Sequence, residues 1–507
     1  MNAIAAEPQQ QILRLIQRID EALALEPANP RFLLHRAQCL FALGRAREAC
    51  ETAAAAHRGA RSEPVLLDAI GTLFSQANEH RRALAAYDQA IALAPNQPRF
   101  LFNRAAVRRF LGQLAEAEQD YDRVIALKPD DYEAYKNRAE LRTQTQDNNH
   151  TVAIETLLAR GISNWTGEVE LRYALAKEYE DLGEYEKSFN HLQRGSRLRR
   201  EHLRYDVATD AATAEWIIHA FPGPAPNEPR ESTAGTGQPA ARDSTAGMSH
   251  RPAHDSTTPA PIFIVGLPRS GSTLVDRILG SHSKVRSAGE LPHFALAVVE
   301  AVHRQSGVAQ LPRKELVARS ANLDFAAVGR DYLARVRAGG MDANRFTDKM
   351  PLNYLYCGLI QRSLPDARIV HVVRAPMASC YAIYKTLFRD GYPFSYDFAE
   401  LARYYAAYRR LMHHWETTMP GHIHVVRYED LVSDQIGASR GLLEFCGLDW
   451  EDACAEFHRN PSPTTTASAS QVRRGIYNTS VSQWRNYAQQ LAPLREHLTA
   501  AGVNCDE

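Results

Sequence analysis

The chain has 507 residues, and at roughly 100 to 200 residues per domain this length predicts at least two domains. Its composition, 45% hydrophobic and 23% charged, is that of a globular protein and excludes wholesale disorder, collagen and a coiled-coil fibre. Lysines and arginines together number 59, as do aspartates and glutamates, so the formal net charge is zero. Whole-chain electrostatics therefore gives no reason to expect binding to nucleic acid or to an anionic membrane.

The N-terminal segment and the cysteines indicate the expected compartment. No basic stretch followed by an apolar core opens the chain, and nowhere do 18 consecutive apolar residues occur. We therefore expect neither a secretion signal nor a membrane span, and a cytoplasmic location. The seven cysteines are scattered without a CxxC pair, which argues against a disulfide framework and against a zinc site. The sequence predicts no metal site.

The first third of the chain repeats itself. The stretch YDQAIALAP at 87–95 recurs 34 residues later as YDRVIALKP at 121–129, and Asn-Arg-Ala recurs with the same offset. A 34-residue period with a Leu-Gly turn and a terminal proline is typical of the tetratricopeptide helix pair, whereas accidental similarity within a helical bundle would not keep one offset. We therefore predict an all-α tetratricopeptide solenoid over 1–205, because such units must stack to bury their apolar faces. The predicted units lie near 32–65, 66–99 and 100–133, with a degenerate unit after 134 and another near 168–202.

A change of composition follows the repeats. From Phe221 to Pro261 the sequence has almost no large apolar side chain and is dense in proline, glycine, serine and threonine. Such a segment cannot offset its ordering entropy by burial. We predict a flexible linker over 206–260, with separate cores on its two sides.

Beyond the linker the pattern becomes one of alternating strands and helices. Short continuous apolar runs occur at 262–265, 368–373 and 422–426, with helical patterns between them. Such runs are typical of strands buried on both faces. The sequence therefore predicts an α/β domain with a parallel sheet over 261–507.

A glycine-rich loop follows the first of these strands. The sequence GLPRSGST, from Gly266 to Thr273, has the spacing of a phosphate-binding loop, GxxxxGK[ST], but Ser272 occupies the lysine position. Backbone N–H groups at a helix N-terminus can hold an anion there. Without that lysine the loop lacks the cation that binds the β- and γ-phosphates of a magnesium-bound triphosphate, so we expect it to bind a smaller anion. The alternative is a plain glycine turn, which the strand, loop and helix order disfavours.

From residue 268 the sequence PRSGSTL resembles the 5′-phosphosulfate loop of sulfotransferases that use 3′-phosphoadenosine 5′-phosphosulfate (PAPS). Further segments similar to that family follow in chain order at 288–290, 347–351, 371–377, 428–431 and 471–484. The first two are similar to the glutamate-bearing and lysine-bearing segments of tyrosylprotein sulfotransferases. The resemblance covers almost all of 261–490, and bacterial-type proteins that join tetratricopeptide repeats to a P-loop-like sulfotransferase domain have the same layout.

The resemblance implies three catalytic residues: Glu290 as general base, Lys349 and Ser482. Transfer of a sulfuryl group from a phosphate to a hydroxyl requires a base for that hydroxyl and a cation near the bridging oxygen, roles that suit Glu290 and Lys349. Taken alone, Glu290 would be interpreted as a helix-capping carboxylate and Lys349 as a solvated lysine. His293 is the other nearby candidate for the base.

The same resemblance implies a set of donor-binding residues. These are Arg269, Ser270, Gly271, Ser272, Thr273, Arg374, Ser379, Tyr428 and Arg474. Arg374 ends a strand, at the sheet edge where ligands bind, and its guanidinium suits a phosphate. Many members have a serine eight residues after this arginine, whereas here Ala382 stands there. Either Ser379 substitutes for that serine, or Arg474 holds more of the 3′-phosphate. Tyr428 and Trp484 are equally compatible with ligand contact and with core packing.

The expected function is transfer of a sulfuryl group from PAPS, without a metal, to a hydroxyl of a protein, peptide, carbohydrate or metabolite, with protein tyrosine among the candidates. The repeat groove is expected to hold a protein partner. The alternative is a tetratricopeptide scaffold whose nucleotide-binding module is catalytically inert. A P-loop kinase is disfavoured by Ser272.

Overall fold

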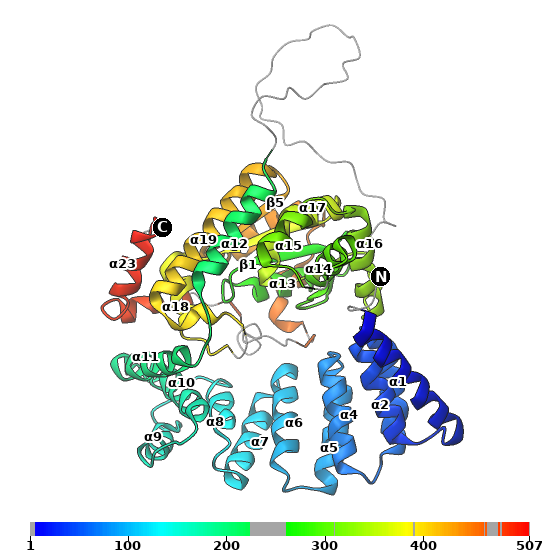
Figure 1. Cartoon of the computed structure of the whole chain (residues 1–507). Helices are drawn as coiled ribbons and strands as arrows, with labels where there is room; N and C mark the ends of the chain where they lie inside the picture. The colour runs from blue at the N-terminus through cyan, green and yellow to red at the C-terminus, as the bar shows by residue number, and fades with distance from the viewer. Residues whose placement is uncertain are drawn as a thin grey trace, which may run out of the picture.

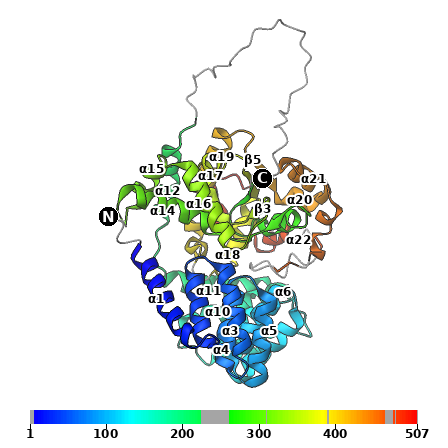
Figure 2. The same ribbon diagram turned by 90° about the vertical axis from the view of Figure 1, so that its right-hand side faces the viewer.

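The computed structural model describes residues 6–223, 260–308, 310–388, 391–460, 462–463, 475–476 and 479–505. Figure 1 shows a curved row of helices on one side of an α/β domain, and Figure 2 shows the same arrangement after a quarter turn. No helix in these ranges has the length and apolarity needed to cross a bilayer.

The helical part confirms the predicted repeats. Its helices are α1 (Ala6–Leu25), α2 (Pro30–Ala42), α3 (Ala46–Gly59), α4 (Pro64–Gln76), α5 (His80–Leu93), α6 (Pro98–Leu111), α7 (Leu114–Leu127), α8 (Tyr132–Ala139), α9 (Thr151–Ala159), α10 (Trp165–Asp181), α11 (Tyr185–Glu201) and α12 (Val207–Ala220). Helices α2–α3, α4–α5, α6–α7 and α10–α11 pack as pairs at four of the predicted units, and α8 and α9, at the unit predicted to be degenerate, each pack against α10. The unit predicted to be degenerate contains the shortest of these helices, α8, followed by an irregular stretch before α9.

Recurring residues explain why these pairs form. Proline occupies the first turn of α2, α4 and α6, where its missing N–H costs no hydrogen bond. Tyr87 and Tyr121, which the 34-residue period relates, are both buried between neighbouring helices. The 34-residue period of the sequence therefore marks residues that are buried at equivalent positions of successive repeats.

The sheet of the α/β domain has five parallel strands in the order β2-β3-β1-β4-β5. Their bounds are β1 (Ile262–Gly266), β2 (Arg286–Ser287), β3 (Phe346–Asp348), β4 (Arg368–Val373) and β5 (Ile423–Arg427). Successive residues of β1 face opposite layers. Ile264 packs in the cluster that contains α13 (Ser272–Leu279) and α21 (Gln435–Phe445), and Phe263 packs in the cluster that contains α14 (His293–Ser306), α16 (Phe325–Ala338) and α19 (Phe398–Thr418). Burial on both faces explains the continuous apolar runs of the sequence.

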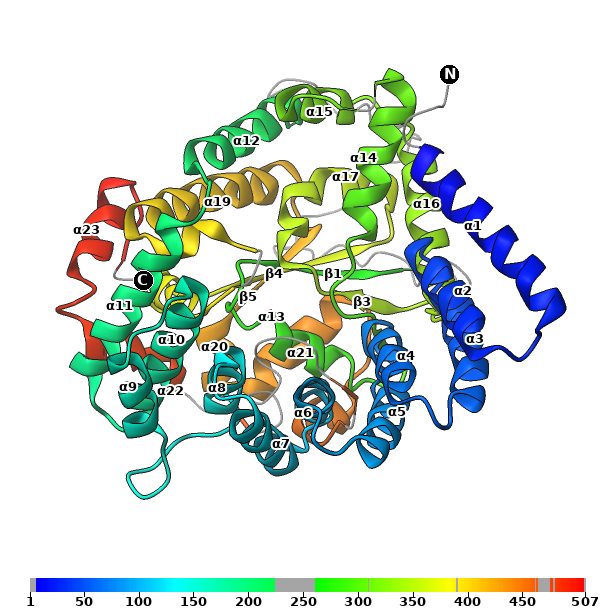
Figure 3. The same cartoon turned by 60° about the horizontal axis from the view of Figure 1, so that its bottom comes forward.

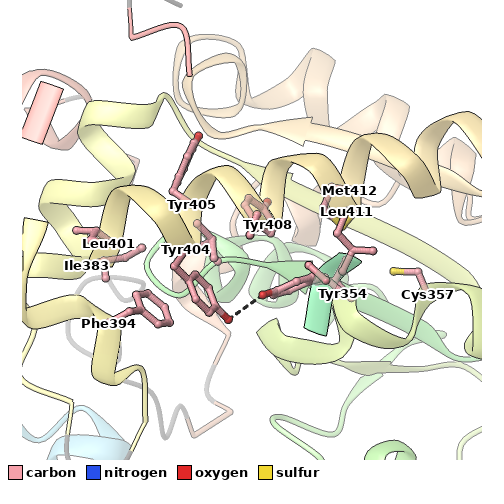
Figure 4. Close-up of a cluster of buried hydrophobic side chains, with 14 of the residues drawn as sticks. Tyr354, Cys357, Ile383, Phe394, Leu401, Tyr404, Tyr405, Tyr408, Leu411 and Met412 are labelled. Atoms are coloured by element: carbon pink, nitrogen blue, oxygen red, sulfur yellow. Dashed lines mark hydrogen bonds between the residues drawn. The ribbon is translucent and has the colours of Figure 1, made fainter. Parts of the chain in front are cut away.

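Helices cover both faces of this sheet, as Figure 3 shows. Their bounds are α13 (Ser272–Leu279), α14 (His293–Ser306), α15 (Arg313–Ser320), α16 (Phe325–Ala338), α17 (Cys357–Ser363), α18 (Pro376–Tyr384), α19 (Phe398–Thr418), α20 (Tyr428–Ser433), α21 (Gln435–Phe445), α22 (Thr479–Ser482) and α23 (Ala492–Ala500), with short 3₁₀ helices that include η1 (Pro351–Tyr356), η2 (Pro393–Tyr396) and η5 (Gln483–Tyr487). Around α19 the core is rich in tyrosine, and the hydroxyls of Tyr354 and Tyr404 meet at 2.7 Å (Figure 4).

Two expectations about the linker are corrected by the structure. The segment 207–220, predicted as flexible linker, is helix α12, which buries Ala214 and Ile217 against the α/β domain. The cores on the two sides are also not separate, because Tyr173 of α10 and Phe189 of α11 belong to the same buried cluster as α19. The proline-rich composition begins only after α12, so the predicted boundary at 206 was too early. Residues 224–259 of the predicted linker lie outside the described ranges.

Candidate functional site

The predicted phosphate loop connects the end of β1 to the start of α13. Gly266 has φ +147°, and a Cβ there would lie 2.5 Å from the carbonyl oxygen of Val372. Gly271 has φ +106°, and a Cβ there would lie 2.5 Å from the ring of Tyr428. Both positions therefore require glycine. Arg269 has the left-handed φ of +65°, a conformation that non-glycine residues seldom adopt outside constrained loops.

The loop contains a buried hydroxyl that suits an anion. Ser270 is 1% exposed, and its Oγ has no hydrogen-bond partner among the described residues. A buried hydroxyl without a partner costs free energy, and a bound phosphate or sulfate oxygen would satisfy it. The helix α13 begins at Ser272, so its unpaired N–H groups lie at the same loop.

A cavity of about 130 Å³ opens beside this loop. Among the predicted donor-binding residues, those that line it are Arg269, Gly271, Ser272, Thr273, Arg374 and Tyr428. The cavity is also lined by residues without a predicted role, namely Tyr381, Lys385, Ser480 and Gln483, and by Trp484. The structure therefore brings the loop, the end of β4 and the start of α22 to one place.

Five predicted residues that the structure describes do not line this cavity, namely Ser270, Glu290, Lys349, Ser379 and Ser482. Ser379 is buried in α18 and does not line it, whereas Ala378 and Ala382 do. Ser482 is exposed at the end of α22, and Ser480, two residues earlier, lines the cavity instead. Arg474 lies outside the described residues.

Arg374 is held firmly at the carboxyl end of β4. Its guanidinium donates to the carbonyl oxygens of Arg269 at 3.1 Å and Ser480 at 2.5 Å. It also lies over the ring of Tyr428, 4.9 Å from the centroid, and the Tyr428 hydroxyl meets the Ser480 hydroxyl at 2.8 Å. These contacts fix the guanidinium of Arg374 at the cavity wall, and a guanidinium is a group that suits a phosphate.

Glu290 and Lys349 lie side by side although 59 residues separate them. The cause is strand pairing: Ser287 of β2 is in register with Thr347 of β3, and the Lys349 N–H donates to the carbonyl oxygen of Gly289 at 2.8 Å. The Lys349 ammonium donates to the carboxylate of Glu290. Lys349 is 2% exposed and Glu290 45% exposed, so the lysine is fixed in the protein and the carboxylate faces outward.

Two buried carboxyl groups, which sequence reasoning missed, lie near Lys349. Asp276 of α13 accepts from the hydroxyl of Thr347 at 2.5 Å, and burial raises its pKa even though Lys349 opposes the shift. Asp348 accepts from the hydroxyl of Tyr332 at 3.0 Å, and burial raises its pKa to about 8. Asp348 lies in the segment 347–351 that the sequence analysis singled out for its lysine, and Asp276 lies in a helical stretch without a motif, so neither carboxyl group was predicted as part of the site.

His293, the competing candidate for the base, begins α14. Burial and, secondarily, the positive charge of Arg335 lower its pKa below the ordinary histidine value. A lowered pKa keeps the imidazole neutral at pH 7, so His293 is chemically capable of accepting a proton. The structure records no hydrogen bond between His293 and either member of the Glu290–Lys349 pair among the described residues.

These features define a class of protein: a helical repeat solenoid packed against a parallel α/β domain that has a glycine-rich loop at the carboxyl edge of its sheet. Comparison with protein families identifies both parts. Residues 261–452 match the sulfotransferase family and residues 69–132 match the tetratricopeptide repeat. The chain thus combines a sulfotransferase-family domain with tetratricopeptide repeats, as the sequence motifs predicted.

Two relatives are similar to this chain in sequence. An uncharacterized protein of Aquifex aeolicus is 30% identical over 394 residues, which cover 76% of this chain and 48% of that protein. A protein-tyrosine sulfotransferase of Drosophila melanogaster is 23% identical over 242 residues, which cover 44% of this chain and 46% of that protein. The chain spans about half the length of these two relatives.

Solved structures give weaker likenesses. The sulfotransferase domain from the Synechococcus PCC 7002 olefin synthase has 20% identity and a TM-score of 0.36, covering 50% of this chain and 98% of that one. The sulfotransferase domain from the curacin biosynthetic pathway has 17% identity and a TM-score of 0.34, covering 48% and 98%.

Proposed function

We propose that this protein transfers a sulfuryl group from PAPS to an acceptor hydroxyl, with Glu290 as the general base. The observation that carries the proposal is the convergence of the five strand ends. The segments after β2 and β3 supply Glu290 and Lys349, the segment after β1 the anion-binding loop, and those after β4 and β5 Arg374 and Tyr428. In a parallel sheet all these ends lie at one edge, where ligands bind.

The donor fits the residues that are present. When bound, PAPS supplies an activated sulfuryl group on a phosphate leaving group. The loop N–H groups and the buried Ser270 hydroxyl would hold its 5′-phosphosulfate, and Arg374 its 3′-phosphate. The absence of the P-loop lysine at Ser272 is consistent with a donor that needs no magnesium.

The pair beside the loop supplies the acid–base chemistry. Glu290 accepts the proton of the acceptor hydroxyl as that oxygen attacks. Lys349, almost fully buried and therefore fixed, stabilises the negative charge that develops on the leaving phosphate. The outward position of Glu290 leaves its carboxylate accessible to an incoming hydroxyl, and Lys349 keeps that carboxylate oriented.

The acceptor is proposed by similarity. The Drosophila melanogaster relative is a protein-tyrosine sulfotransferase, which makes a tyrosine hydroxyl the first acceptor to test. We further propose that the repeats recruit a protein or peptide partner, because tetratricopeptide solenoids provide extended concave binding surfaces.

Two measurements on the full chain test this function. Calorimetry with 3′,5′-ADP, 5′-AMP and magnesium ATP should give tightest binding of 3′,5′-ADP, because only it offers both phosphates. Incubation with PAPS labelled in the sulfuryl group, together with tyrosine-containing peptides and a lysate, should label an acceptor in the wild type and not in Glu290→Gln. Donor binding without labelling would favour the inert scaffold, and preference for magnesium ATP would contradict the proposal outright.

A further inference from the structure

The donor cavity contains a cation that no sequence motif indicated. Lys385, which caps the C-terminus of α18, lines the cavity together with Thr273 and Arg374. Its ammonium donates to the carboxylate of Glu180 at 2.7 Å and to the side-chain oxygen of Gln483 at 3.0 Å. Glu180 belongs to α10, a helix of the last tetratricopeptide pair, 205 residues earlier in the chain.

Glu180 is fixed by the α/β domain on both of its oxygens. Its Oε1 accepts from the hydroxyl of Tyr381 at 2.5 Å and from that of Tyr487 at 3.2 Å, while its Oε2 accepts from Lys385. Its side chain is only 10% exposed. Tyr381 lies one helical turn before Lys385 and also lines the cavity. A single carboxylate of the repeats therefore holds two side chains of the cavity wall.

We propose that Glu180 is a positioning residue for the donor: from the last repeat it holds Lys385 in the wall of the nucleotide cavity, so the repeats complete the donor site. This inference rests on the proposed function, because it assumes that the cavity takes an anionic nucleotide. It also assigns to the solenoid a role other than partner binding.

The chemistry of lysine explains why such a partner is needed. A lysine side chain loses up to about 2 kcal/mol of conformational freedom when it is fixed, so a solvated lysine must be ordered at the moment of binding. Here the ordering precedes binding. Within the described residues, Glu180 and Gln483 use two of the three N–H groups of Lys385, which leaves one for an oxygen of the donor. Pre-ordered groups bind more tightly than flexible ones with the same contacts.

A second part of the solenoid also faces the loop. Glu140, which follows α8, is held by Lys136 at 3.0 Å and Arg109 at 3.1 Å. Burial raises its pKa, but Lys136, Arg109 and Arg269 together lower it to about 2, so the loop arginine lies within electrostatic reach of the repeats. Figure 3 shows the helical row curving around the side of the domain that contains α13. The repeats thus approach the loop and cavity at Glu140 as well as at Glu180.

A double-mutant cycle on the full chain tests the inference, with 3′,5′-ADP as the probe in calorimetry. We expect Glu180→Ala and Lys385→Ala each to weaken binding roughly tenfold, the loss of one charge-assisted hydrogen bond. The double variant should bind no more weakly than either single one, because Glu180 acts through Lys385. In turnover, the KM for PAPS should rise while kcat stays within about threefold, since neither residue is assigned to the reacting atoms.

Ser188→Ala is the matched control. Ser188 lies in the same interface and meets the Tyr487 hydroxyl at 3.0 Å, but the structure gives it no contact with Lys385 or the cavity. It should lower the melting temperature and leave the Kd for 3′,5′-ADP within twofold. If Glu180→Ala behaves the same way, Glu180 is structural only and the inference is wrong. Tighter binding by Glu180→Ala, or losses that add in the double variant, would also overturn it. Failure of the wild type itself to bind 3′,5′-ADP would instead refute the proposed function, and the inference with it.

Discussion

Replacing Glu290 by glutamine tests the proposed mechanism most directly. The change keeps the shape of the side chain and removes its charge and basicity. A general base contributes on the order of 10² to 10⁴ in rate, so the transfer step should slow by that factor. The proposed role places Glu290 at the acceptor hydroxyl and not at the nucleotide, so the Kd for 3′,5′-ADP should change by less than about threefold.

The structure also sets the expected cost in stability. Glutamine leaves the ammonium of Lys349, which is 2% exposed, without its carboxylate partner. Removing one member of a fully buried pair costs about 3 to 5 kcal/mol, whereas an exposed pair contributes about 1 kcal/mol or less. Glu290 is 45% exposed, and Asp276 is a second carboxyl group near the lysine, so we expect a loss of about 1 kcal/mol.

The assay is single-turnover transfer from labelled PAPS, combined with calorimetry and thermal unfolding of the same preparations. His293→Ala is the control, because His293 is the other base in this segment and makes no recorded contact with Glu290 among the described residues. A Glu290→Gln variant with near-normal transfer beside an inactive His293→Ala variant would assign the base to His293. Normal transfer by both variants would show that the reacting hydroxyl lies elsewhere.

Three further predictions follow from other parts of the structure. Arg374→Ala should weaken 3′,5′-ADP about 10- to 100-fold in calorimetry and leave 5′-AMP nearly unchanged, because a charge-assisted contact to the 3′-phosphate is worth about 1.5 to 3 kcal/mol; equal losses for both nucleotides would contradict the assignment. Phe189→Ala should reduce the free energy of unfolding by about 3 to 5 kcal/mol and lower the melting temperature of the nucleotide-binding domain, whose transition is identified because 3′,5′-ADP raises it. Phe74→Ala, in the first repeats, should leave that melting temperature unchanged. Asp348→Asn should flatten the pH dependence of the free energy of unfolding measured in urea. The pKa of Asp348 is about 8 in the folded state and about 4 in the unfolded state, so between these pH values the folded state holds a proton that the unfolded state has released. The wild type therefore loses stability as pH rises, by up to about 1.4 kcal/mol per pH unit. A variant advantage that does not grow from pH 5 to pH 8 would show that Asp348 is already ionised.

Much of the site could be predicted because its residues follow strands in the sequence. The loop from Gly266 to Thr273 follows an apolar run directly, and Arg374 ends another, so local pattern alone places both at a sheet edge. The partnership of Glu290 and Lys349 also depends on β2 pairing with β3, which periodicity does not reveal. Resemblance to a family supplied that information, and the structure supplies the contact.

The missed residues depend on packing between distant segments. Ser480, and not Ser482, lines the cavity and contacts Arg374. Which of the two serines does so depends on how α22 is oriented, and the sequence does not reveal that orientation. The predicted linker included helix α12 because its start was placed at residue 206, before the proline-rich composition begins. The apolar residues of α12, which include Ala214 and Ile217, argue against a linker. Glu180 and Lys385 are 205 residues apart and belong to different fold types, so no local pattern could link them.

The shared core has a physical cause in the nature of a solenoid. Each repeat buries its apolar faces against its neighbours, so the last repeat needs a cap. Here α10 and α11 present Tyr173 and Phe189 to the α/β domain, and Phe189 packs its ring near those of Tyr384, Phe398 and Tyr487. The α/β domain is therefore the C-terminal cap of the repeats, and the same contact places Glu180 at the nucleotide cavity. The same interface caps the repeats and places Glu180 at the cavity. A substitution that destabilises the packing of the last repeat should therefore weaken donor binding, and a bound donor should stabilise that packing by the same free energy.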